Sequence, residues 1–512
     1  MKGDLTPAEF CEELKQRFIE ISTPEERKKH GQFFTPLEVA RFMSKLVPIR
    51  SKALRVLDPG AGTGILACAV CEHGAESRKL KEILIDAYED NLRLVELLNE
   101  SLEYTKKWLE RKNIELTYNI LSEDFILANA RTLWSKESSA YDLAIGNPPY
   151  FKIGKNDPKA RLNLELVYGQ PNIYALFMGV TAELLRDKGV MVFITPRSYT
   201  AGFYFKAFRR RFFGVMRPER VHVFESRKEA FRADEVLQEN IILKARKGGP
   251  ITTMGISTSQ GVRDIYKIKI HRIPVSRALF DFKNHNVIFR LPVNDQESAV
   301  LDIVDRWPGS LHKYGMEIST GPVVPFRAVN FIPTDGGDYE GLVPLLWMQN
   351  VRPMEVRWPL QGSNNSKEKR QFIMDDPGSR KHKLLVKNTN MVLLRRFSAK
   401  EEVRRLVAAP LLEDQLPYEL IGIENHLNYI YRLRGRLTEA ETLGLSALLN
   451  SSLLDRYFRI SNGNTQVSAT ELRAMPMPPM DILSQLGVKI KELPVDPMLE
   501  EVDALVERAL GV

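Results

Sequence analysis

Cysteine is scarce in this chain of 512 residues, which contains only Cys11, Cys68 and Cys71. Three cysteines are too few for a disulfide framework, so we expect an apolar core and a reducing compartment. Apolar runs of the roughly 20 residues that a membrane helix needs are also missing, and no signal-peptide pattern opens the chain. These absences argue against secreted disulfide scaffolds and membrane proteins. We therefore expect a cytoplasmic protein without a membrane partner.

Cys68 and Cys71 are separated by two residues, a spacing that redox proteins use. The pair lies inside a predicted helix rather than at its first turn, where a reactive thiol would be activated, so we interpret both as packing residues. Histidine is scarce as well, with 8 in the chain. No His and Cys cluster has the spacing of metal ligands, and we predict no metal site.

The residues that are present have the composition of a folded globular protein, with 44% hydrophobic and 27% charged residues. A length of 512 residues exceeds what one hydrophobic core usually supports, so two or more domains are expected. The net charge of +8 and the pI near 9.1 favour a polyanionic partner, because clustered Lys and Arg displace the counterions around phosphates.

Short apolar runs alternate with helical stretches between residues 54 and 245, which predicts an α/β fold with a mostly parallel, Rossmann-like sheet. These runs begin at Arg55, Ile83, Leu143, Val190 and Val221. The composition then changes at a Lys-Gly-Gly-Pro sequence ending at Pro250 and in the Thr/Ser-rich stretch after it. We place the domain boundary there, with domains at 1–250 and 251–512.

Two segments near the N-terminus carry helix signals. Apolar residues at helical spacing predict an amphipathic helix over 7–21. In Thr35-Pro36-Leu37-Glu38, Thr35 is expected to cap a second helix, with Pro in its first turn and Glu completing a capping box. The loop Gly31-Gln32-Phe33-Phe34 would then run directly into a helix N-terminus.

The second half has no regular alternation, and we predict a mixed α+β domain there. Prolines and basic clusters such as Arg395-Arg396 are scattered through it. Leucines at helical spacing from Leu445 to Leu453 predict a helix, and residues 461–466 predict a turn or loop.

A strand is predicted to open through a glycine-rich turn into a helix at residues 55–64, where glycines let a ligand approach the backbone. The turn alone is weak evidence for a particular cofactor, since dinucleotide enzymes and ordinary tight turns use similar loops. The next predicted strand ends at Glu89-Asp90, where a carboxylate suits ribose hydroxyls; a solvated strand end is the alternative. Further on, Asp124 is suited to accept from an adenine amine and Phe125 to pack against its ring.

The most specific segment is Asn147-Pro148-Pro149-Tyr150, which follows a predicted strand. An aromatic amine is a poor nucleophile because its lone pair is delocalised into the ring. The side-chain carbonyl of Asn147 and the main-chain carbonyl of Pro148 can accept both amine hydrogens, which favours a pyramidal nitrogen able to attack a methyl sulfonium. The prolines hold these acceptors in place beforehand, and Tyr150 can stack on the base. A simple turn after a strand is the alternative.

Residues 31–36, 58–64 and 147–150, in that order, resemble motifs X, I and IV of the γ-class adenine DNA methyltransferases. The likeness is to TaqI-like and BsuBI/PstI-type modification methylases of type II restriction-modification systems. It implies base flipping in double-stranded DNA and direct transfer of a methyl group from S-adenosylmethionine to adenine N6. It also implies catalysis by Asn147 and Tyr150. The cofactor-binding residues implied are Thr35, Asp58, Gly60, Glu89, Asp90, Asp124, Phe125, Asn147 and Pro149.

Further segments carry the resemblance beyond these motifs. Phe231 resembles the aromatic residue of motif VIII, which would form a second wall for the flipped base; a core phenylalanine is the alternative. Residues 172–177 and 194–199 resemble intervening motifs and are expected to build the pocket wall. Residues 447–452 and 463–467 resemble the specificity region; for Asn464, Thr465 and Gln466 a capped turn is the alternative. The DNA-contact candidates are Arg395, Arg396, Asn464, Thr465 and Gln466.

Other enzymes share the tetrapeptide, including methyltransferases that act on glutamine amides of proteins and on RNA bases. The loop resembling motif X and the roughly 250 later residues with basic clusters favour duplex DNA. A non-catalytic DNA-binding subunit is less favoured because Asn147 and Tyr150 are intact. No nuclease domain is evident, so we expect any cognate restriction endonuclease, which would share the recognition site, to be a separate chain.

Overall fold

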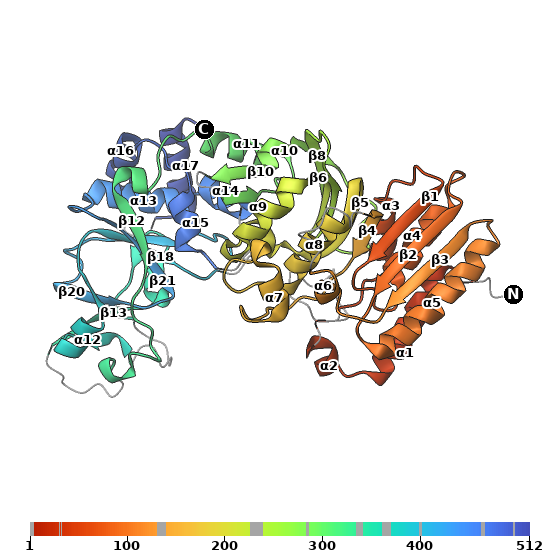
Figure 1. The fold of residues 1–512 in the computed structure, drawn as a ribbon. Helices are drawn as coiled ribbons and strands as arrows, with labels where there is room; N and C mark the ends of the chain where they lie inside the picture. The colour runs from red at the N-terminus through yellow and green to blue at the C-terminus, as the bar shows by residue number, and fades with distance from the viewer. Residues whose placement is uncertain are drawn as a thin grey trace. The chain divides into compact units, whose positions relative to one another are not determined.

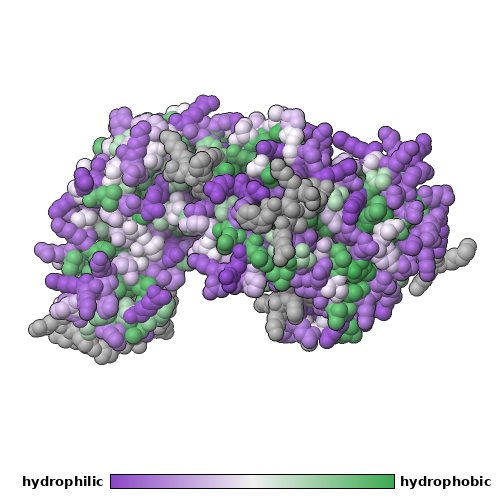
Figure 2. Space-filling model, viewed as in Figure 1, coloured by the Kyte–Doolittle hydropathy of each residue, from purple (hydrophilic) through white to green (hydrophobic). Residues whose placement is uncertain are grey.

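The computed structural model describes residues 5–29, 31, 33–130, 140–225, 239–282, 286–333, 341–360, 370–398, 402–461, 466–494 and 497–512. The chain divides into two compact units, and the division falls between Asn294 and Asp295 (Figure 1). Hydrophilic residues cover most of the face drawn in Figure 2, and hydrophobic residues form smaller patches on it. Within the described residues, no helix has both the length and the apolar character needed to span a membrane.

A nine-stranded sheet forms the centre of the first unit, in the order β3-β2-β1-β4-β5-β7-β6-β8-β9. Strands β1 to β5 pair in parallel, β7 lies antiparallel between β5 and β6, and β8 is parallel to β6. The strands are β1 (Ala53–Asp58), β2 (Glu82–Tyr88), β3 (Glu115–Leu121), β4 (Tyr141–Gly146), β5 (Leu185–Pro196), β6 (Met216–Phe224), β7 (Asn240–Lys247), β8 (Thr253–Ser259) and β9 (His271–Pro274). The predicted α/β fold is confirmed, and each predicted strand run lies within one of these strands.

Helices cover the sheet of the first unit. Figure 1 shows α1, α4 and α5 beside strands β1 to β3, and α8 and α9 farther along the sheet. The predicted helix over 7–21 is α1, which buries Cys11, Leu14 and Phe18. The unit contains α1 (Pro7–Ile21), α2 (Pro24–Lys29), α3 (Leu37–Lys45), α4 (Ile65–Ala75), α5 (Leu92–Glu110), α6 (Phe125–Ala128), α7 (Pro158–Leu162), α8 (Ile173–Leu184), α9 (Lys206–Val215), α10 (Val275–Ala278) and a hairpin of β10 (Leu279–Phe282) and β11 (Asn286–Phe289).

The glycine-rich turn connects β1 to α4. Gly62 and Gly64 have φ values of +58° and +90°, a left-handed conformation that glycine adopts without the strain of a Cβ atom. A Cβ on Gly64 would also lie 2.8 Å from the side chain of Leu98, so this turn packs closely on α5. Cys68 and Cys71 are fully buried on α4 and form no disulfide bond, which confirms that they are packing residues.

The predicted domain boundary at residue 250 is wrong, because the sheet continues beyond it. Strand β8 pairs with β6 over several residues, with Val221 opposite Ile256, and β9 pairs with β8. Gly248 and Gly249 have positive φ values of +65° and +84°. The change in composition near residue 250 therefore marks a turn between two strands of one sheet.

The second unit is a mixed α+β structure, as predicted, with two four-stranded sheets and packed helices. The sheets are β12-β21-β18-β19 and β16-β13-β20-β17. The leucines from Leu445 to Leu453 fall on two helices, α13 and α14, because the chain is extended at Ser451. The elements are α11 (Asp295–Val304), β12 (Met316–Thr320), β13 (Leu342–Leu346), β14 (Val351–Arg352), β15 (Glu355–Val356), β16 (Phe372–Met374), α12 (Pro377–Lys381), β17 (Leu385–Lys387), β18 (Met391–Arg395), β19 (Ala408–Leu411), β20 (Leu420–Ile423), β21 (Leu427–Arg432), α13 (Glu439–Asn450), α14 (Ser452–Ser461), α15 (Ala469–Ala474), α16 (Met480–Ile490) and α17 (Leu499–Leu510).

Helices α13 and α16 approach each other through a pair of glycines. A Cβ on Gly444 would lie 1.9 Å from the Leu483 carbonyl oxygen, and a Cβ on Gly487 would lie 1.8 Å from that of Ala440. These are backbone atoms, so a side chain cannot be accommodated by rotating a neighbour.

Replacing Gly444 with Ala should therefore destabilise the second unit, although Ala favours an isolated helix by about 1 kcal/mol over Gly. We expect a loss of about 1–3 kcal/mol from overpacking, measured by urea unfolding. The control is Gln485→Ala at an exposed position of α16. A Gly444→Ala variant as stable as the wild type would show that the helices do not meet at this residue.

Candidate active site

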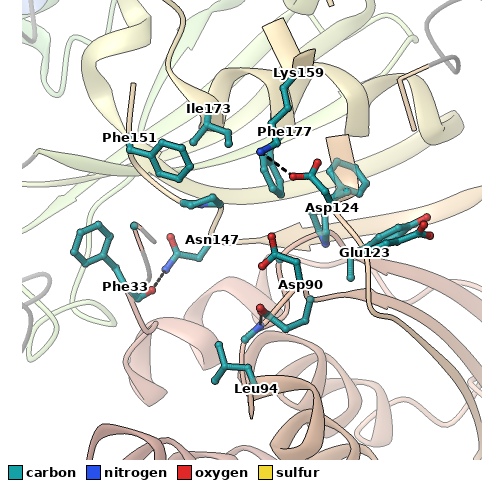
Figure 3. A pocket seen from close by; sticks show the side chains of 18 of the residues that line it. Phe33, Asp90, Leu94, Glu123, Asp124, Asn147, Phe151, Lys159, Ile173 and Phe177 are labelled. Carbon is teal, nitrogen blue, oxygen red and sulfur yellow. Dashed lines mark hydrogen bonds and ion pairs between the residues drawn. The ribbon is translucent and has the colours of Figure 1, made fainter. Parts of the chain in front are cut away.

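A cavity of about 250 Å³ lies where parallel strands of the first unit end at their carboxyl edge. This edge is where open α/β sheets hold ligands. In Figure 3, Phe151, Ile173 and Phe177 lie on one side of the cavity, opposite Asp90 and Leu94. The cavity is lined by Gly31, Phe33, Phe34, Pro59, Gly60, Gly62, Tyr88, Glu89, Asp90, Leu94, Glu123, Asp124, Phe125, Asn147, Pro149, Phe151, Lys159, Ile173 and Phe177.

Glu89 ties the end of β2 to the glycine turn. Its two carboxylate oxygens accept from the backbone N–H of Gly62 at 2.9 Å and of Asn91 at 3.0 Å. Burial raises the pKa of Glu89 to about 7, and the neighbouring Asp90 adds to the shift, while these backbone bonds oppose it. The carboxylate is thus fixed in orientation but costly to ionise in the free protein.

Asp58, the last residue of β1, is fully buried and does not line the cavity. Burial raises its pKa to about 7, and the nearby N–H groups of Gly60 and Ala67 lower it only in part. Neither group reaches hydrogen-bond geometry, so both carboxylate oxygens are buried without a partner among the described residues. A buried carboxyl without a hydrogen-bond partner is rare in folded proteins, and a donor that reached Asp58 would gain a strong hydrogen bond.

Aromatic rings and one cation complete the wall after β3. The ring of Phe125 lies 5.2 Å from Phe177 and 5.1 Å from Tyr88, measured between centroids. Asp124 caps α6 through the N–H of Leu127 at 2.9 Å, and its other oxygen pairs with Lys159 Nζ at 3.0 Å (Figure 3). Despite these acidic side chains, no group of metal-ligating residues occurs in the part of the chain that the structure describes.

The segment before α3 holds the Asn147 amide through two hydrogen bonds. Its Nδ2 donates to the carbonyl oxygen of Phe33 at 2.8 Å and to Thr35 Oγ1 at 3.1 Å. A carbonyl oxygen can only accept, so the amide nitrogen must face Phe33 and the amide oxygen must face away from it. The orientation of the Asn147 amide is therefore fixed, with its nitrogen toward Phe33 and Thr35.

This contact corrects the prediction for Thr35. Helix α3 begins at Leu37 with Pro36 in the N-cap position, and no side chain of the described residues caps it. The Thr35 hydroxyl accepts from Asn147 instead. Thr35 was predicted to cap a helix, but its hydroxyl instead binds Asn147, which lies far along the chain.

Tyr150 supports Asn147 from the opposite direction. Its hydroxyl donates to Asn147 Oδ1 and lies 3.1 Å from the Ile194 carbonyl oxygen. The ring is buried and lies 5.6 Å from Phe33 at an angle of 26°. Burial also raises the pKa of Tyr150 well above its usual value, so the hydroxyl remains a donor at neutral pH.

Most of the residues predicted from the sequence meet around this one cavity. Thr35, Asp58, Pro148 and Tyr150 are not among the lining residues; Thr35 and Tyr150 contact Asn147, whereas Asp58 and Pro148 adjoin lining residues in the chain. Phe231 lies outside the described residues. The predicted residues that line the cavity are Gly60, Glu89, Asp90, Asp124, Phe125, Asn147 and Pro149.

Sequence reasoning missed several lining residues. Lys159 has no motif around it, and only its ion pair with Asp124 in the folded chain places it here. Tyr88 directly precedes Glu89 and could have been proposed from that position. Ile173 and Phe177 line the cavity, as expected for the segment 172–177.

In the second unit, the structure brings two of the DNA-contact candidates together. The Gln466 amide oxygen accepts from Arg396 Nε at 3.0 Å and Nη2 at 2.7 Å. Arg396 Nη1 also donates to the Asn425 carbonyl oxygen. Arg395 is half-buried, and its Nε donates to the Val351 carbonyl oxygen at 2.8 Å. Asn464 and Thr465 lie outside the described residues.

Comparisons with known proteins agree with this geometry. Residues 52–231 match the Eco57I restriction-modification methylase family. The chain is 33% identical over 489 residues to the type II methyltransferase M.BsuBI of Bacillus subtilis, covering 92% of this chain and 93% of that protein. It is 31% identical over 465 residues to the type II methyltransferase M.PstI of Providencia stuartii, covering 91% and 90%.

A solved structure of the type IIL restriction-modification enzyme MmeI in complex with DNA shares the fold, with a TM-score of 0.54 and 12% identity over 98% of this chain and 73% of that one. The two methyltransferases are similar to this chain along nearly its whole length, and the family match covers β1 to β4 and the turns after them. The chain therefore belongs to the family of restriction-modification methyltransferases that includes M.BsuBI and M.PstI.

Proposed function

We propose that this protein is a site-specific DNA methyltransferase that transfers a methyl group from S-adenosylmethionine directly to N6 of a flipped adenine. It would act as the modification enzyme of a type II restriction-modification system, whose cognate endonuclease would share the recognition site. The observation that carries this proposal is the Asn147 amide at the cavity wall, whose nitrogen is held by Phe33 and Thr35 so that its oxygen is turned away from them.

The chemistry follows from what that oxygen can accept. An adenine amine placed beside Asn147 would donate one hydrogen to Oδ1 and the other to the main-chain oxygen of Pro148, while Tyr150 provides an aromatic wall. Two acceptors that are fixed before the substrate arrives cost no reorganisation when positive charge develops on the nitrogen. Phe231 is proposed as the second aromatic wall, beyond the described residues.

The remaining cavity suits an adenosine that carries a cationic sulfonium. When bound, S-adenosylmethionine supplies the electrophilic methyl group. Glu89 would accept from the ribose hydroxyls, and Asp124 and Phe125 would bind the adenine ring of the cofactor. Among the described residues, a Cβ on Gly60 would meet only Phe177, at 3.7 Å, so this glycine leaves the cavity floor open. The other proposed cofactor-binding residues are Thr35, Asp58, Asp90, Asn147 and Pro149.

The second unit is proposed to recognise the target sequence. Its DNA-contact residues would be Arg395, Arg396, Asn464, Thr465 and Gln466. Because Gln466 accepts from Arg396, the pair would present a combined hydrogen-bonding surface rather than two independent side chains.

The proposal is tested by sequencing modified bases in DNA from cells that express the chain, together with mass spectrometry of the digested nucleosides. We expect N6-methyldeoxyadenosine in one short sequence context. Methylated cytosine, or a methylated protein or RNA in place of DNA, would contradict the assignment.

Replacing Asn147 with Ala should lower kcat by about 10²- to 10³-fold, because it removes an acceptor whose role grows toward the transition state. The affinity for S-adenosylhomocysteine, measured by calorimetry, should stay within a few-fold of the wild type. The matched control is Asn99→Ala, an exposed asparagine on α5. Near-normal turnover by Asn147→Ala would exclude the proposed role.

Cofactor affinity should rise with pH across neutrality. The pKa of Glu89 is raised to about 7, so the carboxyl is mostly protonated at pH 6 and mostly ionised at pH 8. Ribose hydroxyls donate better to the ionised carboxylate than to the protonated carboxyl. Because the ionised fraction of one group with this pKa rises roughly 10-fold from pH 6 to pH 8, we expect roughly 10-fold tighter binding of S-adenosylhomocysteine at pH 8 than at pH 6. The Glu89→Gln variant should bind weakly with a flatter pH profile. If the wild-type affinity were independent of pH, Glu89 would not be the titrating ligand.

A further inference from the structure

The segment of residues 151–173, which we call the excursion, connects the tetrapeptide at 147–150 to α8. It begins at Phe151 and returns at Ile173, whose N–H donates to the Phe151 carbonyl oxygen at 3.0 Å. The N–H of Ile153 donates to the Pro171 carbonyl oxygen at 3.1 Å, and Lys152 pairs with Asn172 as a β-bridge. The base of this excursion is thus fixed, and its ends form part of the cavity wall.

The outer part of the excursion exposes apolar side chains. Leu164 on the short turn after α7 is 69% exposed, and Tyr168 is 37% exposed. A second exposed pair, Phe203 and Tyr204, follows the end of β5. Strands β4 and β5 are parallel neighbours, so both segments leave the same edge of the sheet as Asn147 does.

The three exposed aromatic side chains form one cluster. The ring of Phe203 lies 5.2 Å from Tyr168 in an edge arrangement and 6.0 Å from Tyr204. A Cβ on Gly169 would lie 2.4 Å from the Tyr204 ring, so this ring rests directly on backbone. We call Tyr168, Phe203 and Tyr204 the aromatic platform.

The turn that carries two rings of the platform is hydrogen-bonded to α9. The buried guanidinium of Arg209 on α9 donates to the carbonyl oxygens of Tyr199 and Gly202 at 3.0 Å and 2.7 Å, which fixes the turn that carries Phe203 and Tyr204. A fixed turn presents its rings without the entropy cost of ordering a loose loop on binding.

Its charge is complementary to a nucleic acid. Lys206 Nζ lies 3.5 Å from the centroid of Tyr168, so a cation sits on the platform itself. Lys152, Lys155 and Arg161 on the same excursion are exposed, and none has an ion-pair partner among the described residues. Exposed rings interleaved with cations match single-stranded nucleic acid, where bases stack on rings and phosphates meet lysines.

We propose that the aromatic platform binds the bases that lose their stacking beside the flipped adenine, with Lys206 facing the adjacent phosphate. This inference rests on the proposed function, because base extrusion at Asn147 is what would expose those bases. The platform would thereby favour the opened duplex, and it would be a DNA contact of the first unit distinct from target recognition by the second.

The structure provides matched controls. Tyr266 in the same unit is 46% exposed, and Lys45 Nζ lies 4.8 Å from its ring centroid, but this pair belongs to neither segment of the platform. Tyr266→Ala and Lys45→Gln therefore remove the same chemistry from another site.

The test measures the affinity of the full chain, with S-adenosylhomocysteine, for a duplex that carries the methylated sequence found by sequencing. Tyr204→Ala and Phe203→Ala should each weaken binding by about 10-fold, whereas Tyr204→Trp and Tyr266→Ala should bind as the wild type does. Lys206→Gln, unlike Lys45→Gln, should reduce the salt dependence of binding. Affinity for S-adenosylhomocysteine alone should not change.

Photocrosslinking identifies the contact directly. Duplexes with 5-iododeoxyuridine at positions flanking the target adenine should crosslink to Tyr168, Phe203 or Tyr204, as found by peptide mass spectrometry. Wild-type DNA methylation with unchanged affinity in the platform variants and no such crosslink would overturn this inference alone. Altered self-association of the variants without a change in DNA affinity would overturn it in favour of a second copy of the chain. Absence of DNA methylation by the wild type would instead refute the proposed function.

Discussion

The hydrogen bond from Asn147 Nδ2 to the Phe33 carbonyl oxygen is the constraint on which the site depends. An asparagine amide can usually rotate to exchange its nitrogen and oxygen, but a carbonyl acceptor permits only one of the two orientations. Thr35 reinforces that orientation, and the Tyr150 hydroxyl meets the oxygen on the other side. A loop that precedes the first strand thus fixes the orientation of the side-chain amide of Asn147, which follows β4.

The cavity itself follows from parallel strand topology. Strands β1, β2, β3 and β4 lie next to one another, so the residues after their carboxyl ends gather at one edge although they are far apart in sequence. This edge collects several carboxyl groups, and burial raises the pKa of Asp58 and of Glu89 to about 7. The free protein therefore keeps poorly solvated acceptors in place, a state that a ligand with hydroxyl donors and positive charge would relieve.

The features that the sequence predicted were those encoded by short segments. Alternating apolar runs identified the strands, and the glycine turn and the tetrapeptide at 147–150 identified two segments that line the cavity. Features that depend on distant contacts were missed. Thr35 has the local pattern of a helix cap, and only the approach of Asn147 in three dimensions gives its hydroxyl another partner. Lys159 carries no motif, and the glycines near residue 250 gave no sign that another strand of the same sheet would follow.

The central claim is that adenine N6 donates both hydrogens to Asn147 and Pro148. A crystal structure of the protein with its target duplex and S-adenosylhomocysteine measures this most directly. The account predicts a flipped adenine whose N6 lies within about 3.2 Å of Asn147 Oδ1 and of the Pro148 carbonyl oxygen. An adenine still stacked in the duplex, or one whose N6 faces other groups while Asn147 remains bonded only to Tyr150, would contradict it.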